Sequence, residues 1–363
     1  MTTMTTMEVV KHVMSRMGHL FEDTCKLIVR PERAVYTPSD LGPTVFRLSE
    51  DDPLRYHRVD MELENMRGQK LHCSWFRRLD PPTPDPTPCV VYLHGNCGSR
   101  LDALEILPVL QQGMSLFAYD ASGSGLSEGE YVSLGFYERQ DLASVVEFLH
   151  ASHQVSTIGL WGRSMGAVTS IMYAARDDSI ACVVGDSPFA NLRDLCGDLV
   201  QQHARWVPNT VVSAVVNKMR GRIIRMVGFD IDDLDTVSHG ARSTVPAFLF
   251  HGEDDDFVLP KHSLRVANSY AGPCLHRIVK GGHNSYRGDD LDSIVIPFLR
   301  LYLIEKPQEI ARCAKVKRAA VPEAPAESPN NSAGATAEDR DGEENENEED
   351  VSSTAPQEPE VAR

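Results

Sequence analysis

The sequence predicts an α/β domain with a mostly parallel central sheet, helices on both faces and a helical lid insertion. Apolar runs typical of strands alternate with stretches whose apolar residues recur every three or four positions, as in helices. The strand-like runs are almost continuously apolar, which is typical of parallel strands covered on both faces. One connection, residues 190–243, is too long for a simple loop and its apolar spacing is helical, so we expect a lid over the strand ends.

The individual elements follow from local patterns along the chain. Residues 56–65 and 70–78 alternate apolar and polar side chains on either side of an Arg67-Gly68 turn, which predicts an antiparallel hairpin at one edge of the sheet. Apolar runs predict the remaining strands at residues 89–95, 115–120, 157–162, 181–186, 246–252 and 274–279. Helical spacing predicts helices at residues 102–113, 137–150, 165–176 and 292–306.

The chain is expected to have three parts. Residues 1–55 form a lead-in with an amphipathic helix at 7–29, residues 56–306 form the α/β domain, and residues 307–363 form a disordered acidic tail. The N-terminal helix either packs on its own domain or lies on a membrane surface. Its polar face mixes charges of both signs and lacks a dense strip of Lys and Arg, which favours packing.

Charge and cysteine content exclude several classes of function. The formal net charge is −16, and phosphate binding needs clustered Lys and Arg, so we expect no nucleic acid partner. The eight cysteines show no CxxC pair or metal-ligand spacing, which predicts no metal site and fits free thiols in a reducing compartment. No run approaches the roughly 20 apolar residues that span a bilayer. We expect a cytoplasmic protein, with peripheral membrane contact through residues 7–29 as the second hypothesis.

A GxSxG motif at residues 162–166 lies between a predicted strand and a predicted helix. A serine on such a tight turn exposes its hydroxyl, and the flanking glycines let neighbouring elements approach closely. The N-terminus of the following helix places backbone N–H groups and a positive dipole end beside a developing oxyanion. This context predicts that Ser164 is a nucleophile rather than part of an ordinary Gly-rich turn.

A second motif, HGNCGS at residues 94–99, lies at the end of the first strand after the hairpin. Its place in the strand order is that of an oxyanion loop, in which the backbone N–H groups of Asn96 and Met165 hold the anionic oxygen. Cys97 lies in the same loop. Nothing in the sequence indicates a thiolate there, so we interpret Cys97 as a bystander.

A serine nucleophile needs a base, and the base needs an acid that orients it. In this strand–helix arrangement the chain order is serine, acid, histidine. The loop HGEDDDFV offers three carboxylates, and its HGxxDxxV spacing selects Asp255 over Asp254 and Asp256. The rival acid is Asp186, which ends the predicted strand after the nucleophile helix.

The candidate base is His283, in the glycine-rich loop GGHN after the last predicted strand. It follows both the serine and the acid in the chain, and its loop can bring an imidazole over the strand ends. His251 and His276 are the nearest rivals. His251 is more consistent with a structural role before the acid loop, and His276 lies within a predicted strand.

The chain resembles a family of eukaryotic α/β-hydrolases from plants and protists, labelled serine aminopeptidase S33-type, in the segments VVYLHGNCGSR, FAYDASGSGLSEGEYVSLG, IGLWGRSMGAVTS, GDSPFANL, HGEDDDFVLP and GGHNSYR. The resemblance covers roughly residues 20–305. It implies the α/β-hydrolase fold, with Ser164 as nucleophile, Asp255 as acid and His283 as base. The acyl-protein thioesterases share the HGN-type loop, but they carry an N-terminal cysteine cluster where this chain has only Cys25.

These motifs predict a serine hydrolase that cleaves an ester, thioester or amide bond in a small-molecule, acyl or peptide substrate, with no cofactor and no metal. The predicted lid adds four basic residues among apolar ones: Lys218, Arg220, Arg222 and Arg225. They either favour a lipid-like substrate with an anionic part or merely cover the surface. The rival hypothesis is a non-catalytic, membrane-peripheral adaptor with the same fold.

Overall fold

The computed structural model describes residues 21, 25–26, 28–80, 86–203, 208–288 and 291–306. The predicted acidic tail and most of the predicted helix at 7–29 lie outside the described residues. Within the described part of the chain, no helix is long and apolar enough to cross a membrane.

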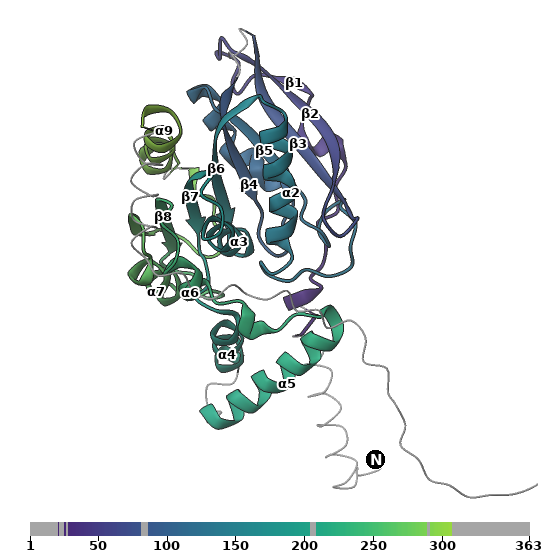
Figure 1. The fold of residues 1–363 in the computed structure, drawn as a ribbon, viewed down its shortest axis with the longest axis vertical. Helices are drawn as coiled ribbons and strands as arrows, with labels where there is room; N and C mark the ends of the chain where they lie inside the picture. The colour runs from purple at the N-terminus through teal and green to yellow at the C-terminus, as the bar shows by residue number, and fades with distance from the viewer. Residues whose placement is uncertain are drawn as a thin grey trace, which may run out of the picture. The chain divides into compact units, whose positions relative to one another are not determined.

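The described strands form one nine-stranded sheet in the order β1-β2-β3-β5-β4-β6-β7-β8-β9 (Figure 1). The strands are β1 (Val45–Phe46), β2 (Arg55–Glu64), β3 (Lys70–Asp80), β4 (Thr87–Leu93), β5 (Ser115–Tyr119), β6 (Val155–Arg163), β7 (Ile180–Asp186), β8 (Ala247–Gly252) and β9 (Cys274–Val279). β1, β2, β3 and β5 pair antiparallel, whereas β5, β4, β6, β7, β8 and β9 run parallel. The prediction of a mostly parallel sheet is confirmed. The hairpin of β2 and β3 forms as predicted, but it lies one strand in from the edge, because the short strand β1, which was not predicted, pairs with β2.

Helices cover both faces of this sheet. They are η1 (Pro38–Leu41), η2 (Arg100–Gln112), α2 (Glu138–Ala151), α3 (Met165–Ala174), α4 (Leu192–His203), α5 (Asn209–Val227), η3 (Ile231–Asp233), α6 (Thr236–Gly240), α7 (Lys261–Ser269), η4 (Leu291–Val295), α9 (Ile296–Arg300) and η5 (Leu301–Glu305). Figure 1 shows α2 and α3 across one face of the sheet, and α4 and α5 beyond one of its ends.

Side chains on the central strands alternate between two core clusters. On β4, Val91 belongs to the cluster that includes Val168 of α3, whereas the adjacent Val90 belongs to the cluster that includes Val109 of η2 and Leu299 of α9. All of these side chains are fully buried, and each such burial stabilises the fold by about 1.5–3 kcal/mol. The core therefore consists of one apolar layer on each face of the sheet.

Several elements differ from the sequence prediction. The segment 100–112 forms a 3₁₀ helix rather than an α-helix, and Pro108, which has no backbone N–H, lies inside it. The nine-residue helix α7 was not predicted, because it is short and follows the acid loop directly. The closing helix forms as predicted, but its first and last turns, η4 and η5, are wound as π-helix.

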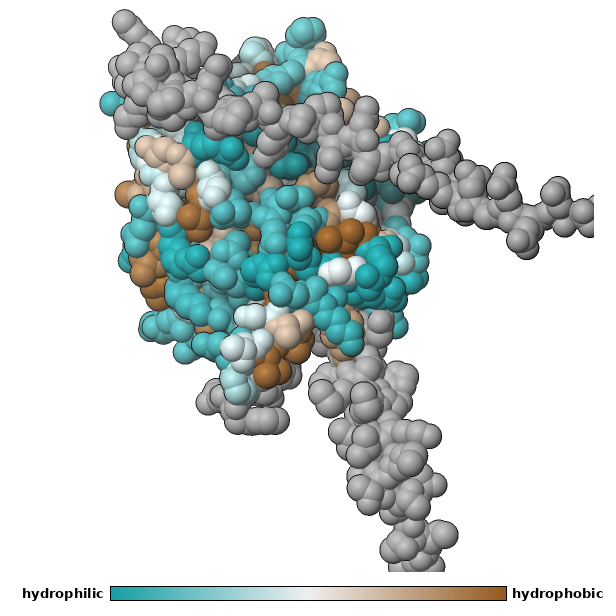
Figure 2. Space-filling model, turned by 60° about the horizontal axis from the view of Figure 1, so that its bottom comes forward, coloured by the Kyte–Doolittle hydropathy of each residue, from teal (hydrophilic) through white to brown (hydrophobic). Residues whose placement is uncertain are grey.

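The predicted lid region contains α4, α5, η3 and α6. Ion pairs join α4 to α7: Lys261 Nζ lies 2.7 Å from a carboxylate oxygen of Asp198, and Arg265 Nη1 lies 2.6 Å from Asp194. Seen from the end of the molecule that carries α4 and α5, the described surface is mostly hydrophilic with scattered apolar groups (Figure 2). The connection between β7 and β8 is thus a helical layer fastened to the α/β domain.

The described end of the N-terminal helix packs against the domain. Cys25, Ile28 and Val29 are buried in the same core cluster as α3 and the lid helices. Lys218 of α5 lies over the ring of Phe21, with Nζ 4.7 Å from the ring centroid. For these residues the structure agrees with packing on the domain.

Candidate active site

Ser164 lies on the turn between β6 and α3, and its backbone φ is +52°, a left-handed value that side chains other than glycine rarely adopt. The turn is tight because a Cβ at Gly162 would lie 2.1 Å from the carbonyl of Gly166, and a Cβ at Gly166 would lie 2.1 Å from the carbonyl oxygen of Leu93. Only glycine fits at both positions. The GxSxG motif therefore forms the strained strand–turn–helix that the sequence predicts.

The HGN loop lies directly beside this serine. An ideal Cβ at Gly95 would be 3.8 Å from the Cβ of Ser164. The Asn96 side chain donates from Nδ2 to the carbonyl oxygen of Ile28 at 3.3 Å, which fixes the loop against the N-terminal segment. The loop thus has the place of an oxyanion loop, and the pairing of the Asn96 and Met165 amides stays a prediction.

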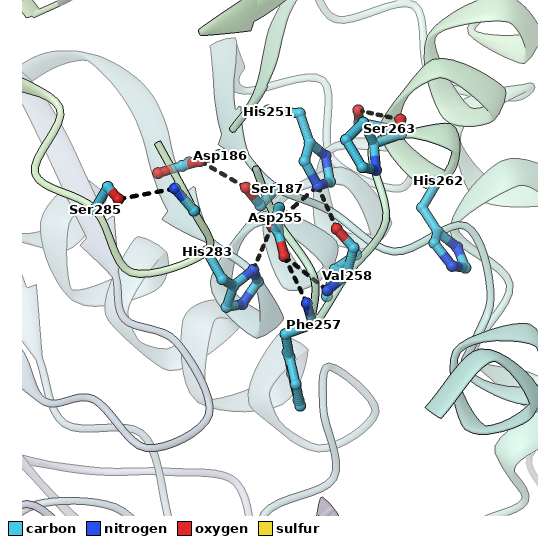
Figure 3. A network of polar contacts seen from close by, with 12 residues as sticks. Asp186, Ser187, His251, Asp255, Phe257, Val258, His262, Ser263, His283 and Ser285 are labelled. Atoms are coloured by element: carbon cyan, nitrogen blue, oxygen red, sulfur yellow. Dashed lines mark hydrogen bonds and ion pairs between the residues drawn. The ribbon is translucent and has the colours of Figure 1, made fainter. Parts of the chain in front are cut away.

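Asp255 and His283 meet at the same edge of the sheet, after β8 and β9 respectively. His283 Nδ1 lies 2.7 Å from Asp255 Oδ2 (Figure 3). The other carboxylate oxygen, Oδ1, accepts backbone N–H bonds from Phe257 at 3.1 Å and Val258 at 2.8 Å. The carboxylate is therefore fixed in orientation and faces the imidazole.

The electrostatics of Asp255 favour its ionised form. Burial by itself would raise the pKa of this carboxyl, but the bonds from His251 and His283 and from the Val258 N–H outweigh it, so the pKa lies well below its usual range. An ionised carboxylate accepts hydrogen bonds only, so His283 Nδ1 carries the proton and Nε2 is left to act as the base.

The rival residues have other partners. Asp186 accepts from Arg163 Nε at 2.9 Å and belongs to a separate ion-pair cluster. Asp254 and Asp256 are exposed, as expected for solvated neighbours. His276 Nε2 bonds the Ser263 hydroxyl at 2.9 Å. Among the candidate residues, the structure joins Asp255 to His283.

Cys97 is exposed in the HGN loop, and partial burial followed by the charge of Glu32 raises the pKa of its thiol. A raised thiol pKa leaves little nucleophilic thiolate at neutral pH. This agrees with the interpretation of Cys97 as a bystander.

Ser164 occupies the same edge of the sheet as this pair. Its N–H donates to the carbonyl oxygen of Asp186 at the end of β7, and Ser187 N–H donates in turn to Phe250 of β8. Ser164, Asp255 and His283 therefore follow the carboxyl ends of β6, β8 and β9, the edge at which open parallel sheets bind ligands. Among the described residues, no hydrogen bond joins the Ser164 hydroxyl to His283. Such bonds are often long before substrate binds.

Sequence reasoning missed Arg287, which is buried four residues after His283. Its Nη2 donates to the carbonyl oxygen of Gly282 at 2.9 Å, and its Nη1 donates to that of Lys280 at 3.1 Å. Its backbone N–H donates to Glu105 of η2 at 2.6 Å. Arg287 thus fastens the loop that carries the candidate base. The only sequence signal was an arginine at the end of the segment GGHNSYR.

In the described ranges, no group of three or more His, Cys, Asp or Glu side chains is arranged to hold a metal ion. The groups gathered at this edge are a serine hydroxyl on a strained turn, a carboxylate–imidazole pair and a glycine-rich loop at a helix N-terminus. Together they have the chemistry for nucleophilic attack, proton transfer and stabilisation of a developing negative charge.

Comparison with known proteins identifies the fold. The model of the alpha/beta hydrolase fold family matches residues 88–230. The structure of the Pyrococcus furiosus esterase Pf2001 superposes with a TM-score of 0.56 at 22% identity, covering 75% of this chain and 98% of the esterase. An acetyl xylan esterase from Paenibacillus sp. R4 gives a TM-score of 0.56 at 19% identity, covering 78% of this chain and 94% of that enzyme. The chain has the α/β-hydrolase fold.

Among curated proteins, the chain is similar to the protein YqkD of Bacillus subtilis. The two are 27% identical over 210 residues, which is 56% of this chain and 67% of YqkD. The chain thus matches about two thirds of the length of this relative.

Proposed function

We propose that this protein is a serine hydrolase that cleaves an ester, thioester or amide bond through an acyl-enzyme. The observation that carries the proposal is the 2.7 Å contact between His283 Nδ1 and Asp255 Oδ2, at the edge of the sheet where the strained turn presents Ser164. The similarity in fold to two esterases supports hydrolysis as the reaction class.

In the proposed mechanism, the Ser164 hydroxyl oxygen attacks the substrate carbonyl carbon while His283 Nε2 takes the hydroxyl proton. The carbonyl oxygen becomes an oxyanion that accepts from the backbone N–H groups of Asn96 and Met165. Collapse of the tetrahedral intermediate expels the alcohol, thiol or amine, which receives the proton from His283. Water then attacks the acyl-enzyme by the same route, and Ser164 regains its proton. Asp255 orients the imidazole throughout and stabilises its charged form.

The substrate is a small-molecule, acyl or peptide compound that enters beneath the lid, residues 190–243. This placement follows from the fold, because ligands of open parallel sheets bind outside the carboxyl ends of the strands. A panel of p-nitrophenyl esters, acyl-CoA thioesters and aminoacyl anilides separates the three bond classes.

A fluorophosphonate probe tests the mechanism directly, because it reacts with activated serines. We expect stoichiometric labelling, with the adduct on Ser164 by mass spectrometry, complete loss in Ser164→Ala and strong loss in His283→Ala. The matched control is Ser170→Ala, in the helix that follows Ser164, whose hydroxyl has a single hydrogen bond within the described part of the chain, to the carbonyl oxygen of Gly166. Equal labelling of the wild type and Ser164→Ala contradicts the proposal, and an unlabelled, folded wild type favours the adaptor hypothesis.

A further inference from the structure

Two imidazoles share one oxygen of the Asp255 carboxylate. His283 Nδ1 lies 2.7 Å from Oδ2, and His251 Nε2 lies 3.1 Å from the same atom (Figure 3). The His251 ring lies on β8, four residues before Asp255, and the side chains of both residues are completely buried. His251 approaches the carboxylate from within the protein, whereas His283 is partly exposed to solvent.

The contacts of His251 determine its protonation. Its Nε2 lies 2.7 Å from the carbonyl oxygen of Val258 and 3.1 Å from Asp255 Oδ2, and both oxygens only accept hydrogen bonds, so Nε2 carries a proton that these two acceptors share. Its Nδ1 is buried and has no hydrogen-bond partner among the described residues. A second proton on Nδ1 would be a buried donor without an acceptor, which is unfavourable. The ring is therefore the neutral tautomer with hydrogen on Nε2.

We propose that His251 is a positioning residue of the proposed serine hydrolase: its neutral ring directs the Nε2–H, shared with the Val258 carbonyl, at Asp255 Oδ2, the oxygen that also accepts from His283. This inference rests on the proposed function. The backbone N–H groups of Phe257 and Val258 hold Oδ1, and the His251 donor holds Oδ2, so the carboxylate cannot rotate. Because a carboxylate that already accepts a bond from His251 is less basic, it stabilises the charged form of His283 less strongly. His251 thus sets both the orientation of the base and the pH at which it works.

The titratable groups around this ring are few. Asp255 and His283 belong to the proposed triad. The third group is His276 of β9, whose pKa is lowered by burial and by its charge interaction with His251. Its Nε2 bonds the hydroxyl of Ser263. His276 has no bond to Asp255 among those the structure describes. His276→Gln is therefore the matched control, because it removes a nearby imidazole and leaves the carboxylate contacts unchanged.

The test compares His251→Phe, which keeps a planar ring and removes the donor, with His251→Gln, which supplies an amide donor near the position of Nε2. The rate of fluorophosphonate labelling is measured as a function of pH. In His251→Phe the rate on the plateau of this pH profile falls about 10- to 100-fold. The acid limb of its pH profile moves to higher pH by about half a unit. In His251→Gln and His276→Gln, both readouts stay close to those of the wild type. Loss of rate with no movement of the acid limb indicates a merely structural role and overturns the inference.

Nuclear magnetic resonance separates failure of this inference from failure of the proposed function. In the wild type with ¹⁵N-labelled histidine at pH 7.5, the ring hydrogen of His251 must lie on Nε2, whatever Ser164 does. The low-field Nδ1 proton of His283 must shift in His251→Phe. A hydrogen on Nδ1 of His251, or an unmoved His283 resonance, overturns the inference even if the labelling assay succeeds. The tautomer measurement needs no variant, so it holds if His251→Phe fails to fold.

Discussion

Arg287 donates through its guanidinium to the carboxylate of Asp186, with Nε 3.2 Å from Oδ2 and Nη2 3.4 Å from Oδ1, although the two residues are 101 positions apart. Arg163, the residue before Ser164, also donates to Asp186 and pairs with Glu105 at 3.2 Å. Glu105 in turn accepts the backbone N–H of Arg287. The four residues close a ring that joins the nucleophile turn to the loop of His283.

Replacement of Arg287 by Met should open this ring. The carboxylate of Asp186 would lose one of its two cationic partners, and the carbonyl oxygens of Gly282 and Lys280 would lose their donors. Because Asp186 keeps its ion pair with Arg163, its charge stays compensated, and the cost comes from the lost hydrogen bonds, so we expect the free energy of unfolding to fall by about 1–3 kcal/mol. Labelling of the folded fraction should fall about 10- to 100-fold, because the histidine loop is no longer held.

Denaturant unfolding and fluorophosphonate labelling measure these two effects. The control is Arg55→Met, which removes an exposed ion pair with Asp80 and should cost within about 1 kcal/mol. An Arg287→Met protein as stable as the control would show that the ring does not hold the loop.

Two carboxylate variants distinguish the acid of the proposed triad from its rival. Asp255→Asn loses the charge that fixes the His283 tautomer, so labelling should fall about 10³- to 10⁴-fold. Asp186→Asn weakens the ring but leaves the Asp255–His283 bond in place, so its labelling, normalised to folded protein, should fall far less. The reverse order of the two rates would assign the acid role to Asp186.

The candidate triad could be predicted from sequence because each member has a local signal. Ser164 lies in a five-residue motif, Asp255 in a spaced loop motif, and His283 in a glycine-rich loop after the last strand. Arg287 and Glu105 have no such signal, because their contact joins residues 182 positions apart and depends on how η2 packs beside the histidine loop.

The fold shows the same division. Apolar runs predicted the strands, since burial on both faces leaves a continuous pattern in the sequence. The strand order could not be predicted in this way, because the position of β5 between β3 and β4 results from long-range pairing that no local pattern specifies. The helix η2 has an ordinary helical spacing of apolar residues, so its 3₁₀ winding was not visible in that spacing.

The glycines of the nucleophile turn give a prediction about stability. Gly162→Ala would place a Cβ 2.1 Å from the carbonyl of Gly166, a backbone atom that cannot move aside. We expect the free energy of unfolding to fall by about 3 kcal/mol and labelling to be lost. The contrasting substitution is Gly197→Ala in α4, where the nearest atom is 4.0 Å away and the helix should gain about 0.5–1 kcal/mol. Thermal unfolding of both variants checks the prediction, and equal effects would contradict it.

The lid is attached to the domain in part through His262. His262 of α7 is completely buried; its Nδ1 accepts the Ala190 N–H at 3.1 Å and its Nε2 donates to Asp198 of α4 at 2.9 Å. Burial lowers the pKa of His262 more than the neighbouring Asp198 raises it. A second proton would occupy Nδ1 and break the bond to Ala190. Lys261 also pairs with Asp198, so part of the attachment persists in acid.

The sign follows from proton linkage. Because the folded pKa of His262 lies below its unfolded value of about 6.5, the folded state binds fewer protons. The contribution of His262 to the free energy of unfolding is fully present above about pH 6.5 and is lost as the pH falls through the folded pKa. We therefore expect amide hydrogen exchange in α4, corrected for the intrinsic effect of pH, to be faster at pH 5.5 than at pH 7.5. His262→Gln, which has no titratable ring, should flatten this dependence, whereas His150→Gln, an exposed histidine bonded to Ser179, should not. If the wild type and His262→Gln respond to pH equally, another group controls the attachment of α4.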